Sequence, residues 1–271
     1  MVKLASVRTC RQYGPQGSRD QWENINAFVY LLATVLLLLG CAMQLPGYNN
    51  KMGLVVILIS LILVVAVNLH DLYAQLAGIS YRLDFLSLDP QLAFIEVAAP
   101  LVQTIGGIIF FFGVLLLFRT TPGRSTWHKQ IDSVEITAFR LIVLGPALWL
   151  LGSIHNAFQV YKKADFRVQA FQKAVTIPFI IGSTLLLSSA IVALETWPLE
   201  SLTQAQATAA WLAIGGSAFL VLAAIMNVLR VTHLQEAERT GAELEPLRGG
   251  AHERLLHIRQ PFLAERRASD I

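Results

Sequence analysis

The sequence predicts an all-α, polytopic membrane protein with six transmembrane helices, and three observations support this fold class. Hydrophobic residues make up 55% of the 271 residues and charged residues 14%, whereas soluble domains contain about 45–50% and about 25%. Six long apolar stretches are separated by shorter polar or turn-rich segments. Lysine and arginine gather on one side of the topology that these stretches imply. A soluble domain could not cover so much apolar surface, whereas lipid accepts it.

The first two predicted spans are 25–45 and 53–73. Each contains about 20 mostly apolar residues, enough for a helix to cross a hydrocarbon core of about 30 Å. The segment between them, LPGYNNK (45–51), is rich in residues that favour a turn. The first apolar run is too long for the core of a signal peptide, and no small-residue cleavage site follows it. We therefore expect it to be retained as a span.

The remaining spans are predicted at 92–118, 137–160, 174–194 and 208–229. Turn residues occur in FRTTPGR (118–124) and ETWPLE (195–200). In lipid the backbone must satisfy its own hydrogen bonds, and these stretches are too long and too uniformly apolar for barrel strands, so helices are expected. The six spans form one transmembrane domain over 25–229, between an N-terminal tail (1–24) and a charged C-terminal tail (230–271).

The placement of positive charge predicts the orientation of the bundle. Sixteen of the 21 lysines and arginines fall in the two tails and in the 74–91 and 161–173 connections, which share one face of the membrane. The opposite face carries the other five. Because cytoplasmic segments are enriched in lysine and arginine, both termini are expected to face the cytoplasm.

The spans pair into three helical hairpins that share a faint repeat. The second helix of each hairpin ends in a related string, NLHDLY (68–73), NAFQVY (156–161) or NVLRVT (227–232). One interpretation is that the hairpins are related repeats, a feature of many transporters. The other is a chance similarity, in which each asparagine only caps a helix or hydrogen-bonds across the bundle.

Polar side chains inside the apolar spans are the candidate functional residues, because such groups are costly in lipid. The predicted cluster lies at the cytoplasmic ends of the second, third, fourth and sixth spans. It comprises Asn68, His70, Asp71, Glu96, Gln103, His155, Asn156 and Asn227. If these spans adjoin, the cluster forms a polar cap over the bundle. The cap would bind a cation, relay protons or ligate a metal or haem, or it would only hydrogen-bond the helix ends together.

His70 and His155 are the candidate ligands of a metal ion or haem. Histidines on the second and fourth spans are similar to the axial ligands of six-helix b-type cytochromes, but the spans at 92–118 and 174–194 contain no histidine. The resemblance would therefore imply one haem at most. The sequence has no HExxH, GxSxG, P-loop or strand-linked GxGxxG motif, so no catalytic residue is predicted and a non-enzymatic role is expected.

Three functional classes follow from these features. The first is a membrane subunit or organiser that acts through helix packing and binds another membrane protein or a cytoplasmic partner through its C-terminal tail. The second is a transporter or channel for a small solute, ion or proton that uses Asp71, Glu96 and His155. The third is a single-haem or metal-binding redox protein. The absence of motifs favours the first class, and a net charge of +3 without a compact basic block gives no indication of nucleic-acid binding.

Overall fold

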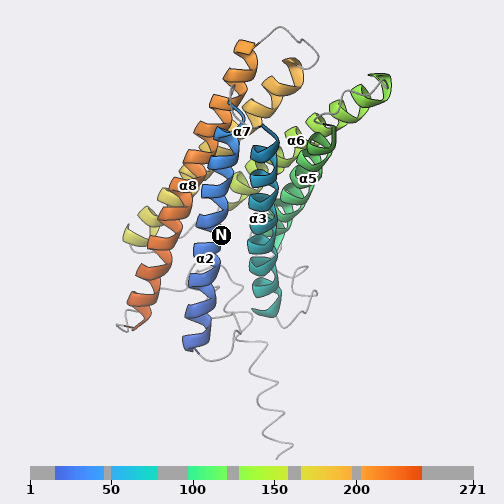
Figure 1. Ribbon diagram of the computed structural model, residues 1–271. Helices are drawn as coiled ribbons and strands as arrows, with labels where there is room; N and C mark the ends of the chain where they lie inside the picture. Colours follow the sequence, from blue (N-terminus) through green and yellow to red (C-terminus); the bar gives the residue numbers. More distant parts are fainter. Residues whose placement is uncertain are drawn as a thin grey trace, which may run out of the picture.

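The computed structural model describes residues 16–45, 50–78, 97–120, 128–157, 166–196 and 203–239. These residues form helices and no strand (Figure 1). The helices are α2 (Gln16–Ala42), α3 (Asn50–Gly78), α5 (Ala98–Thr120), α6 (His128–Ala157), α7 (Phe166–Thr196) and α8 (Thr203–Arg239). The predicted all-α fold with six membrane-spanning helices is confirmed.

Each helix is long and apolar enough to cross a membrane. The shortest apolar segments, Asp20–Ala42 and Ala98–Thr120, have 23 residues each. At about 1.5 Å per residue such a segment is about 35 Å long, which exceeds the hydrocarbon thickness of about 30 Å. Large apolar side chains remain exposed on the outside of the bundle, among them Ile62, Phe112 and Ile177, each more than 50% exposed. This outer surface suits lipid.

Every helix except α5 extends at least five residues beyond its predicted span at one end, and the extensions of α2 and α8 lie at the same end of the bundle. α2 begins at Gln16, before the predicted start at 25, and α8 continues to Arg239, past the predicted end at 229. The two extensions pack on each other through polar groups that are buried. Hydropathy places the end of a span at the last apolar residue. The helix itself can continue beyond that point when its polar side chains are hydrogen-bonded or paired with a neighbouring helix. The buried polar residues of the extensions are Asp20, Glu23, Arg230 and Gln235.

The third span begins later than predicted, with α5 starting at Ala98. Pro100 lies in its first turn, where a missing backbone N–H removes no intrahelical hydrogen bond. Several predicted features lie outside the described residues. These are residues 92–96, including Glu96, the segments 1–15 and 158–160, and the C-terminal segment 240–271.

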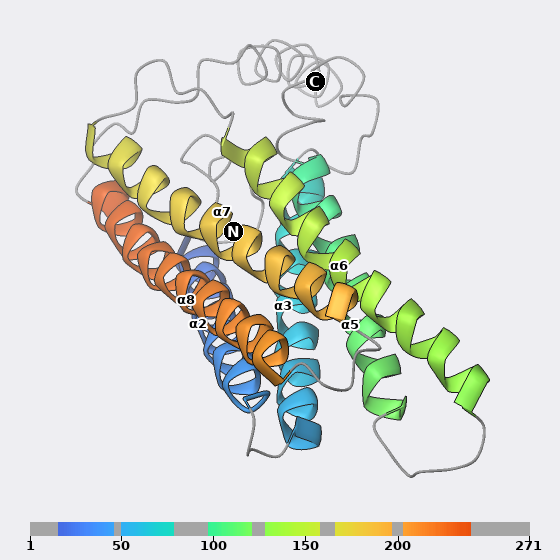
Figure 2. The same ribbon diagram turned by 90° about the horizontal axis from the view of Figure 1, so that it is seen from above.

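The helices form a closed ring in chain order. Each helix packs against the next one along the chain, and α8 packs against α2 to close the ring. Figures 1 and 2 show α8 beside α2 on one side and α3 beside α5 on the other. Because successive helices run in opposite directions, α2 begins and α8 ends at the same end of the bundle, which we call the terminal end.

The core of the ring is an apolar layer between its two ends. Leu37 of α2, Leu61 of α3 and Leu220 of α8 are at most 1% exposed. Phe110 of α5 packs edge-on against Trp149 of α6, with 5.7 Å between the ring centroids. These side chains belong to one apolar cluster that joins neighbouring helices of the ring.

Glycines set the packing distance within each of the three hairpins. The pairs Gly40–Gly53, Gly106–Gly145 and Gly182–Gly216 join α2 to α3, α5 to α6 and α7 to α8. A Cβ atom on any of these glycines would lie 2.8–3.0 Å from the carbonyl oxygen of its partner. The small residue therefore lets the two backbones approach closely, as in other transmembrane helix pairs.

The glycine contacts share a register with the asparagines of the predicted repeat. Ile57, Gly145 and Gly216 each lie eleven positions before Asn68, Asn156 and Asn227, respectively. In each hairpin this residue contacts a glycine of the first helix, namely Gly40, Gly106 or Gly182. All three asparagines are at most 5% exposed. The match is not exact, because the glycine that pairs with Gly40 is Gly53, fifteen positions before Asn68, so the relation between the three hairpins stays a prediction.

Candidate functional site

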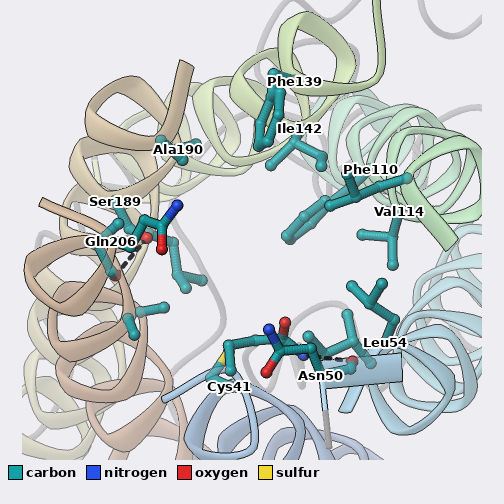
Figure 3. Close-up of a pocket in the computed structure, with 18 of the residues that line it drawn as sticks. Cys41, Asn50, Leu54, Phe110, Val114, Phe139, Ile142, Ser189, Ala190 and Gln206 are labelled. Carbon is teal, nitrogen blue, oxygen red and sulfur yellow. Dashed lines mark hydrogen bonds between the residues drawn. The ribbon is translucent and has the colours of Figure 1, made fainter. Parts of the chain in front are cut away.

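A vestibule of about 320 Å³ opens along the ring axis, toward the end opposite the terminal end. All six helices contribute to its wall, and Figure 3 shows side chains pointing into it from around the ring. Its apolar side chains include Leu54, Phe110, Val114 and Ile142. Ligand pockets in proteins typically enclose about 300–1,000 Å³, so the vestibule has the volume of a small-molecule site.

The polar groups of the vestibule lie mainly near its mouth. Gln44 follows the end of α2, Asn50 begins α3 and Gln206 lies in the first turn of α8. Gln44 donates a hydrogen bond of 3.1 Å from its Nε2 to the carbonyl oxygen of Asn50. Deeper in, the Ser189 hydroxyl donates to the carbonyl oxygen of Ala209 at 2.7 Å. The described residues that line the vestibule include no charged side chain.

A second, much smaller cavity lies below the vestibule on the ring axis. Its volume is about 10 Å³, and it too is lined by residues from all six helices. Leu37 lines both spaces. The polar residues of the small cavity, here called the central cavity, are Tyr30, Thr34, Asn68 and Gln103.

Gln103, the sixth residue of α5, lines the central cavity, and its backbone accepts a hydrogen bond from α6. The indole N–H of Trp149 donates a hydrogen bond of 3.1 Å to the Gln103 carbonyl oxygen. Its side chain is 3% exposed, and within the described part of the chain its Nε2 has no hydrogen-bond partner. A buried amide donor without a partner carries its full desolvation penalty.

A cluster of buried polar residues lies at the terminal end, where α2 packs between α3 and α8. This terminal cluster consists of Asp20, Glu23, Asn26, Asp71, Arg230 and Gln235, each less than 9% exposed. Asn26 donates to the Oδ1 of Asp71 at 2.9 Å, and Gln235 donates to the backbone carbonyl of Asp20 at 3.0 Å. Buried charges require partners, and none of the four charged side chains lacks one.

The structure buries most of the side chains that the sequence predicted to cluster. Asn68, Asp71, Gln103, Asn156 and Asn227 are each at most 5% exposed. Of these, Asn68 and Gln103 meet at the central cavity. Asp71 bonds to α2, a helix from which the sequence analysis selected no residue. Glu96 lies outside the described residues.

The two candidate histidine ligands are only partly buried. His70 packs against Trp22 of α2, with 6.1 Å between the ring centroids, and Trp22 is 50% exposed. His155 lies on α6, whose ring neighbours are α5 and α7. Among the residues that the structure describes, no three His, Cys, Asp or Glu side chains are grouped so as to hold a metal ion.

Sequence analysis missed the polar face of α2, which contributes to both the central cavity and the terminal cluster. A signal was present in the spacing of its residues. Asp20, Glu23, Ala27, Tyr30, Thr34, Leu37 and Cys41 follow one another at alternating intervals of three and four. Such a pattern marks one face of a helix. All seven are buried, and the stripe faces the interior of the ring.

Comparisons with known protein families, with curated proteins and with solved structures found no match to this chain.

Proposed function

We propose that this multi-pass membrane protein binds a neutral, largely apolar small molecule in the vestibule and acts as a transporter for it. The observation that supports the proposal is the vestibule of about 320 Å³ on the axis of the helical ring, walled by all six helices. A ring around an axial site can open the site toward either end by tilting its hairpins, which is the usual basis of alternating access.

The lining of the vestibule favours a neutral ligand. A charged molecule would lose its hydration on entering and find no opposite charge among the described wall residues. An apolar body fits against Leu54, Phe110 and Ile142, and a carbonyl, hydroxyl or amide group at its outer end could hydrogen-bond Asn50 or Gln206. Molecules with one apolar part and one neutral polar end form the expected ligand class.

The side from which the ligand enters depends on the orientation of the bundle. The distribution of lysine and arginine predicts that both termini are cytoplasmic. The vestibule opens away from the terminal end, so under this orientation it receives its ligand from the non-cytoplasmic side or from the outer part of the bilayer.

The organiser hypothesis rests on a different part of the chain. Its predicted partner-binding segment is the C-terminal tail, 230–271, of which 240–271 lies outside the described residues, and it stays a prediction. The redox hypothesis likewise stays a prediction, since it needs His70 and His155 as ligands of one group. The vestibule is the specific feature that favours transport over both.

Native mass spectrometry of the protein released from mild detergent tests ligand binding. We expect the wild-type chain to carry non-protein mass that is lost in Ala213→Trp, because Ala213 lines the vestibule and an indole there would fill it. Ala218→Trp is the matched control, since Ala218 lies on the same helix but is exposed on its surface.

Lipids held on the outside of the ring would remain on both variants. Adducts that are identical in the wild type and Ala213→Trp, or a wild-type chain without any adduct, would refute ligand binding in the vestibule.

A further inference from the structure

The central cavity lies inside a membrane-spanning bundle, yet four of the nine side chains that line it are polar. Polar groups at this depth are costly unless they are hydrogen-bonded. Gln103 is the clearest case, because its buried Nε2 has no partner within the described residues.

The size of the cavity limits what it can hold. A space of about 10 Å³ corresponds to about one water molecule, because a water needs about 10–15 Å³ of probe-occupied volume. A buried water also needs polar partners, typically about three. A larger molecule would have to displace the apolar residues that surround the space, among them Leu37 and Trp149.

The hydrogen-bonding capacities of the lining residues complement a water molecule. The Gln103 Nε2 can donate to the water oxygen. Thr34 already donates its hydroxyl hydrogen to the carbonyl oxygen of Leu31 at 2.9 Å, so its oxygen is left to accept from the water. The amide of Asn68 and the hydroxyl of Tyr30 each supply both a donor and an acceptor.

We propose that the central cavity is a binding site for a single structural water, held between Gln103 of α5 and the polar side chains Thr34 and Asn68 of α2 and α3. The water satisfies the buried Gln103 amide and bridges α5 to the first hairpin at the centre of the ring. It lies below Leu37 and one helical turn from Asn26 and Asp71, since Tyr30 and Asn68 are four and three residues from them. This site does not depend on a ligand in the vestibule.

Radiolytic footprinting tests the proposal, because X-rays convert bound water into hydroxyl radicals that oxidise neighbouring side chains. The protein is studied in lipid nanodiscs, and oxidation is measured at Tyr30 and Trp149, which line the cavity. The reference is Phe112, which is 52% exposed on the outer face of α5, where the lipid of the nanodisc would cover it. Rates are normalised to the intrinsic reactivity of each residue type.

We expect Tyr30 and Trp149 to be oxidised several-fold faster than Phe112, although both are buried. Gln103→Leu should lower both rates toward that of Phe112, because the cavity loses the donor that holds the water. Thr104→Val is the matched control. Thr104 is a neighbouring buried polar residue that bonds the Pro100 carbonyl and does not line the cavity, so its loss should leave the rates unchanged.

Two results would overturn the proposal. One is a wild-type protein in which Tyr30 and Trp149 are oxidised no faster than Phe112. The other is equal oxidation in the wild type and Gln103→Leu. If Gln103→Leu does not fold, Thr34→Val replaces it, because this variant removes a hydroxyl at nearly constant volume and should lower the same two oxidation rates. The wild-type comparison of Tyr30 and Trp149 with Phe112 needs no variant and tests the presence of the water by itself.

Discussion

Asn26 of α2 donates a hydrogen bond of 2.9 Å to Asp71 of α3, and both side chains are buried at the terminal end of the bundle. Farther along the same interface, the Ser60 hydroxyl of α3 donates to the carbonyl oxygen of Ala33 at 2.7 Å. Two polar contacts therefore join the first hairpin at separate depths. The first involves a carboxyl group that is 2% exposed, so its loss should be costly.

We predict that Asn26→Leu destabilises the protein, because the Asp71 carboxyl loses a buried donor. The expected cost is about 0.5–1.5 kcal/mol, the typical net contribution of a hydrogen bond in a folded protein. Asn24→Leu is the matched control, since Asn24 is only partly buried and its bond to Gln235 is longer, at 3.2 Å. Thermal unfolding in detergent should show a clearly larger decrease in Tm for Asn26→Leu. Equal decreases in Tm would show that the hydrogen bond from Asn26 to Asp71 stabilises the protein no more than the bond from Asn24 to Gln235.

The glycine pairs predict opposite effects for two adjacent substitutions. In Gly216→Ala the new Cβ would lie 2.9 Å from the Gly182 carbonyl oxygen and from the Leu186 nitrogen, so α7 and α8 must separate. Overpacking of this kind costs about 1–3 kcal/mol. In Gly215→Ala the nearest atom is Leu185 Cδ1 at 3.7 Å, and replacing a helical glycine by alanine gains about 0.5–1 kcal/mol. Tm should fall for the first variant and hold or rise for the second. A lower Tm for Gly215→Ala than for Gly216→Ala would contradict the packing described for this hairpin.

The vestibule predicts different reactivities for two cysteines on α7. In a background with Cys10→Ser and Cys41→Ser, Ala193→Cys places a thiol in the vestibule wall, whereas Ile191→Cys places one on the exposed outer face. A charged, membrane-impermeant methanethiosulfonate should modify the first and not the second, because the vestibule opens at one end of the bundle whereas Ile191 lies on its outer surface.

Applied separately to each side of sealed vesicles, the same reagent reports the orientation. Reaction from the non-cytoplasmic side alone would agree with cytoplasmic termini. Reaction from the cytoplasmic side alone would reverse the orientation predicted from lysine and arginine.

Leu37 is predicted to separate the vestibule from the central cavity. A Thr34→Cys reporter lies in the central cavity and should resist the methanethiosulfonate reagent while Leu37 is present. Adding Leu37→Ala should join the two spaces and make the reporter reactive. Leu61→Ala is the control, because Leu61 is equally buried in the same core but lines neither space. Each Leu→Ala change lowers the free energy of unfolding by about 2–5 kcal/mol. A general loss of stability would therefore raise the reactivity of the reporter in both variants. Reactivity in both would argue against a specific barrier at Leu37.

The candidate site was only partly predictable from the sequence. Asn68, Asp71 and Gln103 stood out because they interrupt apolar runs, and the structure buries all three. Asp20, Glu23 and Arg230 belong to the predicted polar tails, because hydropathy is a property of the single residue and contains no information about the partner helix. Their burial depends on α8 packing against α2 from the far end of the chain.

By itself the sequence determined the all-α class and the six membrane-spanning helices. Both follow from local physics, because a run of about 20 apolar residues in lipid must satisfy its backbone hydrogen bonds within one helix. Only the tertiary structure decided that the helices close into a ring, that Leu37 lines both a vestibule and a polar cavity, and that Asn26 meets Asp71. These features depend on which face each helix turns toward its neighbours. In lipid, packing between helices distant in the chain sets that choice, since apolar side chains are equally well solvated on either face.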